Sequence, residues 1–250
     1  MQDLNNQRAL VTGGSSGLGL GVTEALVARG AKVMVVARDT QRLAEVESRL
    51  GVTGAVGDVT DRAVAVSLLQ EFRPTVLVLN AGAHPPMGPL HELSWDSFSG
   101  PWNNDVKAGF HWLQEALRLP LAPGSRVLIS SSGAAVGGSP MSGGYAGAKR
   151  MLWFMASYAN VVSTEQNLGI RFQALVLQQM TAAGGVGRAG ADAYSRRKGV
   201  TREQFLAGFG KPLSAGEYGD YVARILSEPQ YQEAPAYGIK GDSGIVALGA

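Results

Sequence analysis

Arg8-Ala-Leu-Val-Thr12 is followed directly by Gly13-Gly14-Ser15-Ser16-Gly17-Leu18-Gly19. The apolar run predicts a short buried strand, and the apolar spacing after Gly19 predicts a helix that ends near Arg29. Glycines at such a junction let a phosphate group approach the backbone, where free N–H groups and the positive end of the helix dipole bind it. The turn therefore predicts a dinucleotide site, although a glycine cluster alone also fits a plain tight turn.

Strand-like and helix-like segments alternate along the rest of the chain. Short apolar runs predict strands at 32–37, 54–56, 75–80, 126–131, 170–177 and 236–240. Helical patterns cover 40–50, 61–72, 94–119, 144–165, 201–208 and 215–226. Residues 178–200 predict a long loop, within a substrate lid at about 178–208. We therefore expect one α/β domain over residues 1–250, with a doubly wound parallel sheet of about seven strands and helices on both faces.

Composition excludes several classes of site. The chain of 250 residues has no cysteine, which excludes disulfides and cysteine-bound zinc, and its three histidines are too scattered to predict a metal site. The net charge of +2 is spread without long runs of one sign, so no nucleic-acid partner is expected. The N-terminal residues show no apolar signal core and the apolar runs are of strand length. We expect a cytoplasmic protein with no membrane partner.

A second glycine-rich stretch runs from Ser132 to Lys149. A helix that begins near Gly144 would place Tyr145 and Lys149 four residues apart, on one face and one turn from each other. An ammonium beside a phenol stabilises the phenolate, so it is expected to lower the tyrosine pKa from its usual value of about 10. Tyr145 is therefore predicted to give or take a proton near neutral pH.

The end of the second predicted strand indicates which dinucleotide binds. An acidic residue there would bind the adenosine ribose, but this chain has Ala37 and then Arg38. A guanidinium suits the 2′-phosphate of NADP(H), and Ser16 offers a hydroxyl to the same group. Asp39 opposes this interpretation, and we interpret it as a solvent-facing cap of the next helix. NADP(H) is therefore favoured over NAD(H).

Four motifs occur in an order that resembles the classical short-chain dehydrogenase/reductase family over essentially the whole chain. They are Thr12-Gly-Gly-Ser-Ser-Gly-Leu-Gly19, Asn80-Ala81-Gly82, Ser132 and Tyr145-x-x-x-Lys149. The resemblance implies a Rossmann-like fold and hydride transfer between NADP(H) and a carbonyl or secondary alcohol. It also implies that Ser132 orients the substrate oxygen, that Tyr145 transfers the proton, and that Lys149 holds the nicotinamide ribose.

The same resemblance implies contacts along the cofactor. Asp58 and Val59 are expected beside the adenine, and the Asn80 motif close to the adenine-side ribose. The family's usual Pro-Gly after strand six is replaced by Leu177-Gln178, and the residues that follow still offer backbone and a hydroxyl to the nicotinamide amide. The full set expected to bind the cofactor is Gly13, Ser15, Ser16, Gly17, Leu18, Gly19, Arg38, Asp58, Val59, Asn80, Ala81, Gly82, Tyr145, Lys149, Met180 and Thr181.

A second departure concerns the helix before strand five. The family usually has an asparagine there whose backbone helps to hold a water near the lysine, whereas this chain has Asp105, with Asn104 one residue earlier. Asp105 fills the catalytic role if the backbone carbonyl is what matters. Otherwise the proton relay differs, or Asp105 is a solvated helix residue. Pro101, inside the same expected helix, predicts a kink.

The walls of the substrate site are expected from residues 83–93, 133–143 and 178–205. Apolar candidates there are Met87, Val136, Met141, Met180 and Tyr194. The basic side chains of the last segment are Arg188, Arg196, Arg197 and Lys198. They are either solvated or one of them meets an acidic group of the substrate.

The same features leave two alternative functions open and predict that the protein forms a homo-oligomer. A narrower enzyme alternative is a 3-oxoacyl thioester reductase acting on a carrier protein or CoA, and a remote one is a non-catalytic NADP(H)-binding sensor. A homodimer or homotetramer is expected, because many aromatic residues fall on the two helices around strand five, where they fit a buried dimer face. These residues are Trp102, Phe110, Trp112, Trp153, Phe154 and Tyr158.

Overall fold

The structure is a computed structural model that describes residues 3–181, 185–210, 212–241 and 243–249. Its strands form one sheet in the order β3-β2-β1-β4-β5-β6-β7-β8, parallel throughout except for β8, which pairs antiparallel with β7. The strands are β1 (Arg8–Thr12), β2 (Lys32–Ala37), β3 (Thr53–Val56), β4 (Val76–Leu79), β5 (Arg126–Ser132), β6 (Arg171–Leu177), β7 (Ala236–Lys240) and β8 (Gly244–Leu248). The predicted doubly wound α/β fold is confirmed.

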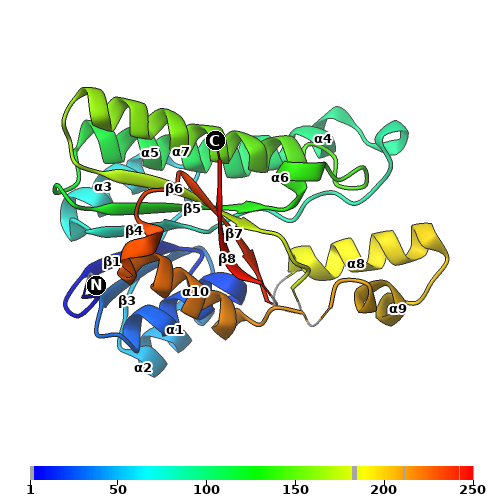
Figure 1. Ribbon diagram of the computed structural model, residues 1–250, viewed down its shortest axis with the longest axis horizontal. Coiled ribbons are helices and arrows are strands. Elements are labelled where there is room, and N and C mark those ends of the chain that lie inside the picture. Colours follow the sequence, from blue (N-terminus) through cyan, green and yellow to red (C-terminus); the bar gives the residue numbers. More distant parts are fainter. Residues whose placement is uncertain (1–2, 182–184, 211, 242, 250) are drawn as a thin grey trace.

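Helices cover both faces of the sheet, as Figure 1 shows. One face carries α3 (Arg62–Phe72), α5 (Lys107–Arg118) and α7 (Tyr145–Glu165), and the other carries α1 (Gly17–Val27), α2 (Thr40–Leu50) and α10 (Ala215–Ser227). The described residues form two hydrophobic clusters, one under each helical layer, because strands buried on both faces are apolar along their whole length.

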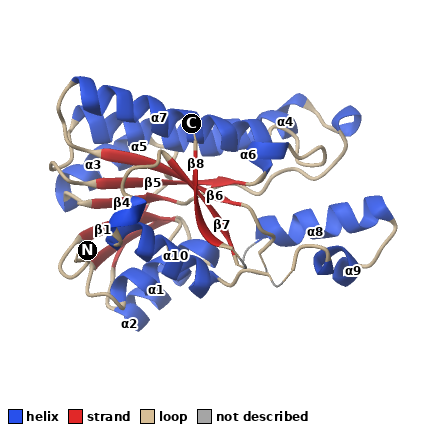
Figure 2. Cartoon of the chain, viewed as in Figure 1, coloured by secondary structure: helices blue, strands red, loops and turns tan. Residues whose placement is uncertain are grey.

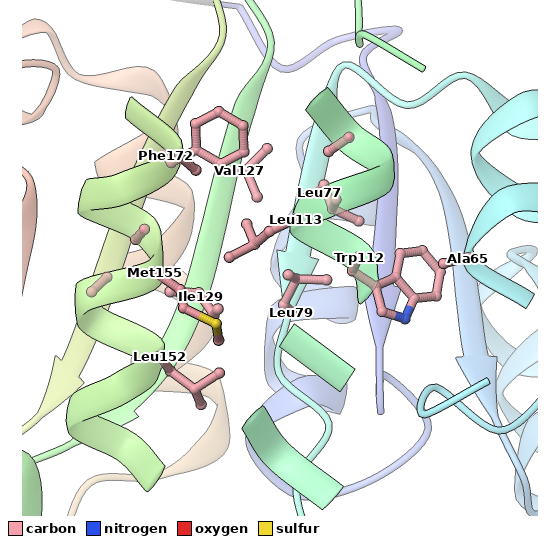
Figure 3. Packing of buried hydrophobic residues seen from close by; sticks show 14 of the residues in the cluster. Ala65, Leu77, Leu79, Trp112, Leu113, Val127, Ile129, Leu152, Met155 and Phe172 are labelled. Atoms are coloured by element: carbon pink, nitrogen blue, oxygen red, sulfur yellow. The ribbon is translucent and has the colours of Figure 1, made fainter. Parts of the chain in front are cut away.

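The cluster beneath α5 and α7 supports the wall that carries the predicted tyrosine (Figure 3). Trp112 from α5, Leu152 from α7 and Ile129 from β5 are almost fully buried there. The indole N–H of Trp112 donates to the Val59 carbonyl oxygen at 3.1 Å, so this large side chain is also fixed by a polar contact. Close packing of this kind fixes where α7 begins relative to the ends of the strands.

One prediction about the second half of the chain is wrong. Residues 178–200 do not form a long loop, because Gly185–Lys198 is the helix α8; residues 182–184 of the expected lid lie outside the described residues. The sheet has an eighth strand, β8, where about seven were expected, because the chain turns back through Gly244 at a φ of 70°. Helix α8 and helix α9 (Arg202–Ala207) project beyond the ends of the strands (Figure 2).

The helix expected over 94–119 is divided into three segments. It comprises α4 (Trp95–Pro101), a π-helical turn over Trp102–Val106 (η2) and α5. The predicted kink at Pro101 is therefore a change of helix type at the residue that lacks a backbone N–H. Short elements complete the fold: η1 (Leu90–Glu92), α6 (Ala134–Gly137) and η3 (Pro229–Tyr231). Within the described ranges, no helix has the length and apolar character needed to cross a membrane.

Candidate functional site

A cleft of about 1080 Å³ opens at the carboxyl ends of the parallel strands. The direction of winding reverses between β1 and β4, and the crevice at such a switch point is where doubly wound sheets bind dinucleotides. The four residues predicted to be catalytic line this cleft together: Asp105, Ser132, Tyr145 and Lys149. All of the residues predicted to bind the cofactor line it too, except Gly17 and Gly19.

The glycine turn lies where β1 meets α1, and its glycines have different tasks. Gly13 and Gly17 adopt left-handed φ angles of 67° and 54°, which side chains disfavour. Gly19 does not reach the cleft, and a Cβ there would overlap the Gly13 carbonyl oxygen and come within 2.6 Å of the Asn80 amide nitrogen. Gly17 and Gly19 therefore determine the backbone path of the turn, and neither of them lines the cleft.

The start of α1 lies beside the cleft and has no side-chain cap. Ser16 is the N-cap of α1, but its side chain makes no capping hydrogen bond, and the first turn has no acidic residue. Thr12 joins the turn to the Asn80 motif, since its hydroxyl oxygen accepts from the N–H groups of Asn80 at 3.0 Å and Ala81 at 3.2 Å. Uncapped helix N–H groups beside a glycine cradle fit the pyrophosphate of a dinucleotide.

Charged groups surround the other end of the cleft, at the ends of β2 and β3. Arg38 lines the cleft directly after β2. Asp39 caps α2 by accepting from the Arg42 N–H at 3.1 Å, and its carboxylate also lies 3.3 Å from the Arg42 guanidinium. The predicted cap at Asp39 is therefore confirmed, and Arg42, which was not predicted from the sequence, also lines the cleft.

Asp58, beside the same end, is held in its ionised form. Its carboxylate accepts from the N–H and from the hydroxyl of Thr60, each at 2.8 Å. These two hydrogen bonds, the backbone one first, lower the pKa of Asp58, and burial only partly opposes them. A carboxylate fixed in this way can accept hydrogen bonds from a ligand in the cleft.

The tyrosine and the lysine are positioned by the start of α7. That helix begins at Tyr145, after Gly144, whose N–H donates to the Phe98 carbonyl oxygen at 3.1 Å. A Cβ at Gly144 would collide with the same oxygen, so only glycine allows this approach between α4 and α7. One turn later, the Lys149 carbonyl oxygen accepts from the Ser131 hydroxyl at 2.8 Å, which ties α7 to the end of β5.

Ser132 is the last residue of β5 and lies partly exposed at the cleft. Its hydroxyl oxygen accepts from the Ala134 N–H at 3.3 Å. Tyr145 and Lys149 line the same wall and are almost buried, and Lys149 Nζ lies 5.6 Å from the centroid of the Tyr145 ring. A hydroxyl, a phenol and an ammonium therefore face one space, which is the set needed to orient and protonate a substrate oxygen.

Lys149 is also held in place by an ion pair with Asp105. Its Nζ lies 2.9 Å from the Asp105 carboxylate, and the two side chains are only 8% and 0% exposed. Burial is the largest single effect on Lys149 and lowers its pKa, but the negative charge of Asp105, the direct contact with Asp105 and the contributions of Tyr145 and Tyr218 together outweigh it, so the pKa is raised. The interpretation of Asp105 as a solvated helix residue is excluded.

Further residues of the cleft come from the loop after β4 and from the segments around α8 and α9. Of the apolar residues expected at the substrate site, Met87, Met180 and Tyr194 line the cleft, whereas Val136 is largely exposed and Met141 is buried away from it. Of the four basic residues named, only Lys198 lines the cleft. Phe205 and Phe209, which the sequence did not indicate, line it as well; the Phe205 ring stacks on Tyr194, and the Phe209 ring packs at a tilt against Phe205.

The chain matches the family model described as short chain dehydrogenase over residues 7–187. Among curated proteins, it is 36% identical over 146 residues to Senescence-associated protein 13 of Arabidopsis thaliana, a match that covers 53% of this chain and 54% of that protein. It is 29% identical over 245 residues to the cis-2,3-dihydrobiphenyl-2,3-diol dehydrogenase of Pseudomonas putida, covering 94% of this chain and 82% of that protein. The chain spans about half the length of several of the curated relatives it matches.

A solved structure with a similar fold is an NAD⁺-bound xylitol dehydrogenase. It superposes with a TM-score of 0.81 at 18% identity and covers 94% of this chain and 97% of its own. At this level of identity, the likeness concerns the fold alone.

Proposed function

Because this chain belongs to the short-chain dehydrogenase family, we propose that it is an oxidoreductase that transfers a hydride between NADP(H) and a carbonyl or secondary alcohol. One observation carries the proposal: Ser132, Tyr145 and Lys149 face one cleft that also contains the glycine turn. When bound, the nicotinamide supplies or accepts the hydride. The residues of this chain bind the cofactor, orient the substrate and transfer the proton to or from the substrate oxygen.

The proton transfer belongs to Ser132 and Tyr145. The Ser132 hydroxyl donates a hydrogen bond to the substrate oxygen and holds it beside the Tyr145 hydroxyl. In the reducing direction, Tyr145 gives its proton to that oxygen as negative charge develops there, and in the oxidising direction it removes the proton from the alcohol. Lys149, one helical turn away, stabilises the phenolate that remains and binds the ribose hydroxyls of the nicotinamide. Met180 and Thr181, in the segment after β6, are assigned to the nicotinamide amide.

The preference for NADP(H) rests on the charges at the end of β2. Arg38 lines the cleft there, and Ser16 adds a hydroxyl, so both suit a 2′-phosphate. The negative charge of Asp39 is turned to the start of α2 and is paired with Arg42, which reduces its repulsion of a phosphate. Gly13, Ser15 and Leu18 line the cleft and would hold the pyrophosphate, and Asp58, Val59 and the Asn80 motif line it and would hold the adenosine.

The substrate is a small molecule with an apolar body, because Met87, Met180, Tyr194, Phe205 and Phe209 line the cleft. A 3-oxoacyl thioester is the second candidate, since Lys198 lines the same cleft and makes a cation–π contact with Phe205 at 5.3 Å. A non-catalytic NADP(H) sensor is disfavoured, because such a protein would not need the serine, tyrosine and lysine together.

A homodimer or homotetramer is part of this proposal. Four of the aromatic residues on the helices around β5 are exposed, whereas Trp112 and Trp153 are buried in the core. The exposed four are Trp102, Phe110, Phe154 and Tyr158. Exposed aromatic side chains on adjacent helices are typical of an interface core.

A reductase screen tests this function. The purified protein is incubated with NADPH or NADH and with a panel of simple ketones, ring ketones and acetoacetyl-CoA. We expect carbonyl-dependent oxidation of NADPH in preference to NADH, and faster turnover of apolar ketones than of the thioester. Turnover restricted to acetoacetyl-CoA would favour the thioester reductase, and NADPH binding without turnover of any carbonyl would favour the sensor.

A further inference from the structure

Two opposite charges are buried against each other beneath the candidate proton donor. Asp105 lies in the π-helical turn η2 and Lys149 in α7, and their side chains meet at 2.9 Å. Neither side chain is more than 8% exposed. Burying a charge away from water is costly, and the attraction between the two opposite charges offsets that cost only while they stay in contact, so each group fixes the other.

The surroundings of Asp105 suit a carboxylate rather than an amide. One carboxylate oxygen, Oδ1, accepts from the Ala83 N–H at 2.7 Å, and the other, Oδ2, faces the ammonium. Oδ1 therefore accepts a hydrogen bond, whereas Oδ2 meets the ammonium as an ion pair without hydrogen-bond geometry. An asparagine in the same position would turn its own NH₂ group toward either the Ala83 N–H or the Lys149 ammonium, where donor meets donor.

Gly82 makes room for the pair. A Cβ on Gly82 would lie 3.0 Å from Asp105 Oδ2 and 3.3 Å from Lys149 Nζ, so the loop after β4 closes directly over both charged groups. The π-helical turn after Pro101 then brings Asp105 to the buried side of this loop. Such turns disturb the regular helix and occur frequently at functional sites.

Few other groups face the ammonium. The Ser130 carbonyl oxygen of β5 lies 3.5 Å from Nζ, Tyr145 stands one turn away on α7, and the buried Tyr218 approaches from α10. Tyr218 is not a second anion near neutral pH, because burial raises its pKa above the usual value. Among these groups, Asp105 supplies the negative charge that balances Lys149.

We propose that Asp105 is a positioning residue that holds Lys149 and offsets part of its charge, so that proton transfer at Tyr145 operates at a higher pH than an amide at position 105 would set. The inference rests on the proposed function and deepens it. A single ammonium beside a phenol favours the phenolate, whereas an ammonium already paired with a carboxylate favours it less. Loss of the carboxylate should therefore make Tyr145 ionise at lower pH.

The test measures the ionisation of Tyr145 directly, without cofactor. The tyrosinate absorbance of each protein is titrated and compared with that of the same protein carrying Tyr145→Phe, which isolates one of the seven tyrosines. Asp105→Asn and Asp105→Ser remove the charge. Glu115→Gln is the matched control. Glu115 lies on α5, and its buried carboxylate pairs with the Arg62 guanidinium at 2.7 Å.

We expect the midpoint of the Tyr145 titration to fall by about one pH unit in Asp105→Asn and Asp105→Ser, and to stay within about 0.3 of wild type in Glu115→Gln. The pH profile of carbonyl reduction should move in the same direction. An unchanged or higher midpoint would overturn the proposal, as would loss of the folded state in both Asp105 variants while Glu115→Gln folds. If wild type reduces no carbonyl, the proposed function fails, but this titration still gives its answer.

Discussion

Lys149 Nζ lies 5.6 Å from the centroid of the Tyr145 ring, and both side chains come from the first turns of α7. The helical repeat fixes their spacing, and the Ser131 hydroxyl ties the same turn to the end of β5. Ser132, the next residue of that strand, is thereby held on the same wall of the cleft. If this wall is a catalytic site, loss of the Ser132 hydroxyl or of the Tyr145 hydroxyl should impair turnover.

Ser132→Ala should lower kcat by about 10²–10³-fold, because it removes a donor aimed at the oxygen on which charge develops. Steady-state kinetics with the best ketone of the panel measures the effect. Ser163→Ala is the control: Ser163 is a buried serine at the far end of α7 that bonds to Ile170, so its loss should cost about 1 kcal/mol of stability and leave kcat unchanged. Equal kcat in Ser132→Ala and Ser163→Ala would remove Ser132 from the mechanism.

Arg38→Asp should weaken NADPH binding at least about tenfold more than NADH binding, since it replaces an attractive charge with a repulsive one beside the 2′-phosphate. The two Kd values can be measured from the quenching of protein fluorescence. Arg49→Asp makes the same charge change at the far end of α2, where Arg49 pairs with Glu24, and should affect both cofactors equally. If Arg38→Asp also affects both equally, the 2′-phosphate is bound elsewhere.

Arg126→Met should lower the free energy of unfolding by about 2–4 kcal/mol, because buried acceptors lose their donor. The Arg126 guanidinium is buried and donates to the Ile225 and Tyr231 carbonyl oxygens, both at 3.2 Å, and to Gln173. Urea unfolding gives the difference. Arg171→Met, at an exposed arginine of the neighbouring strand, should cost less than about 1 kcal/mol. A similar decrease in the free energy of unfolding in both variants would show that the buried hydrogen bonds of Arg126 do not stabilise the protein more than an exposed arginine does.

Local patterns were sufficient to predict most of the fold. Apolar runs gave β1 and β2 with their observed ends, and Asp39 was identified as the cap of α2 because acceptor side chains favour helix starts. Helix α8 was missed because its sequence is rich in glycine, which disfavours helices. In the structure, Gly187 packs so close to Thr181 that a Cβ would lie 2.5 Å from its carbonyl oxygen. Tertiary contact therefore outweighs propensity there.

The sequence identified which residues belong to the candidate site, but it did not show which of them contact one another. Motif spacing identified Tyr145 and Lys149, because four residues on a helix always share a face. It identified Asp105 only as a departure, since the contact between η2 and α7 depends on how two distant helices pack. Phe205 and Phe209 gave no signal, because no periodic pattern shows that α9 turns back to the cleft.

Tyr145→Phe tests the central claim most directly, with NADPH affinity and carbonyl turnover measured on the same preparation. The ring keeps its packing and loses only the hydroxyl. We predict that NADPH binds within about twofold of the wild-type Kd, while kcat falls by about 10²–10⁴-fold, the usual contribution of general acid–base catalysis. A variant that binds NADPH and still reduces the ketone at the wild-type rate would contradict the assignment of Tyr145 as the proton donor.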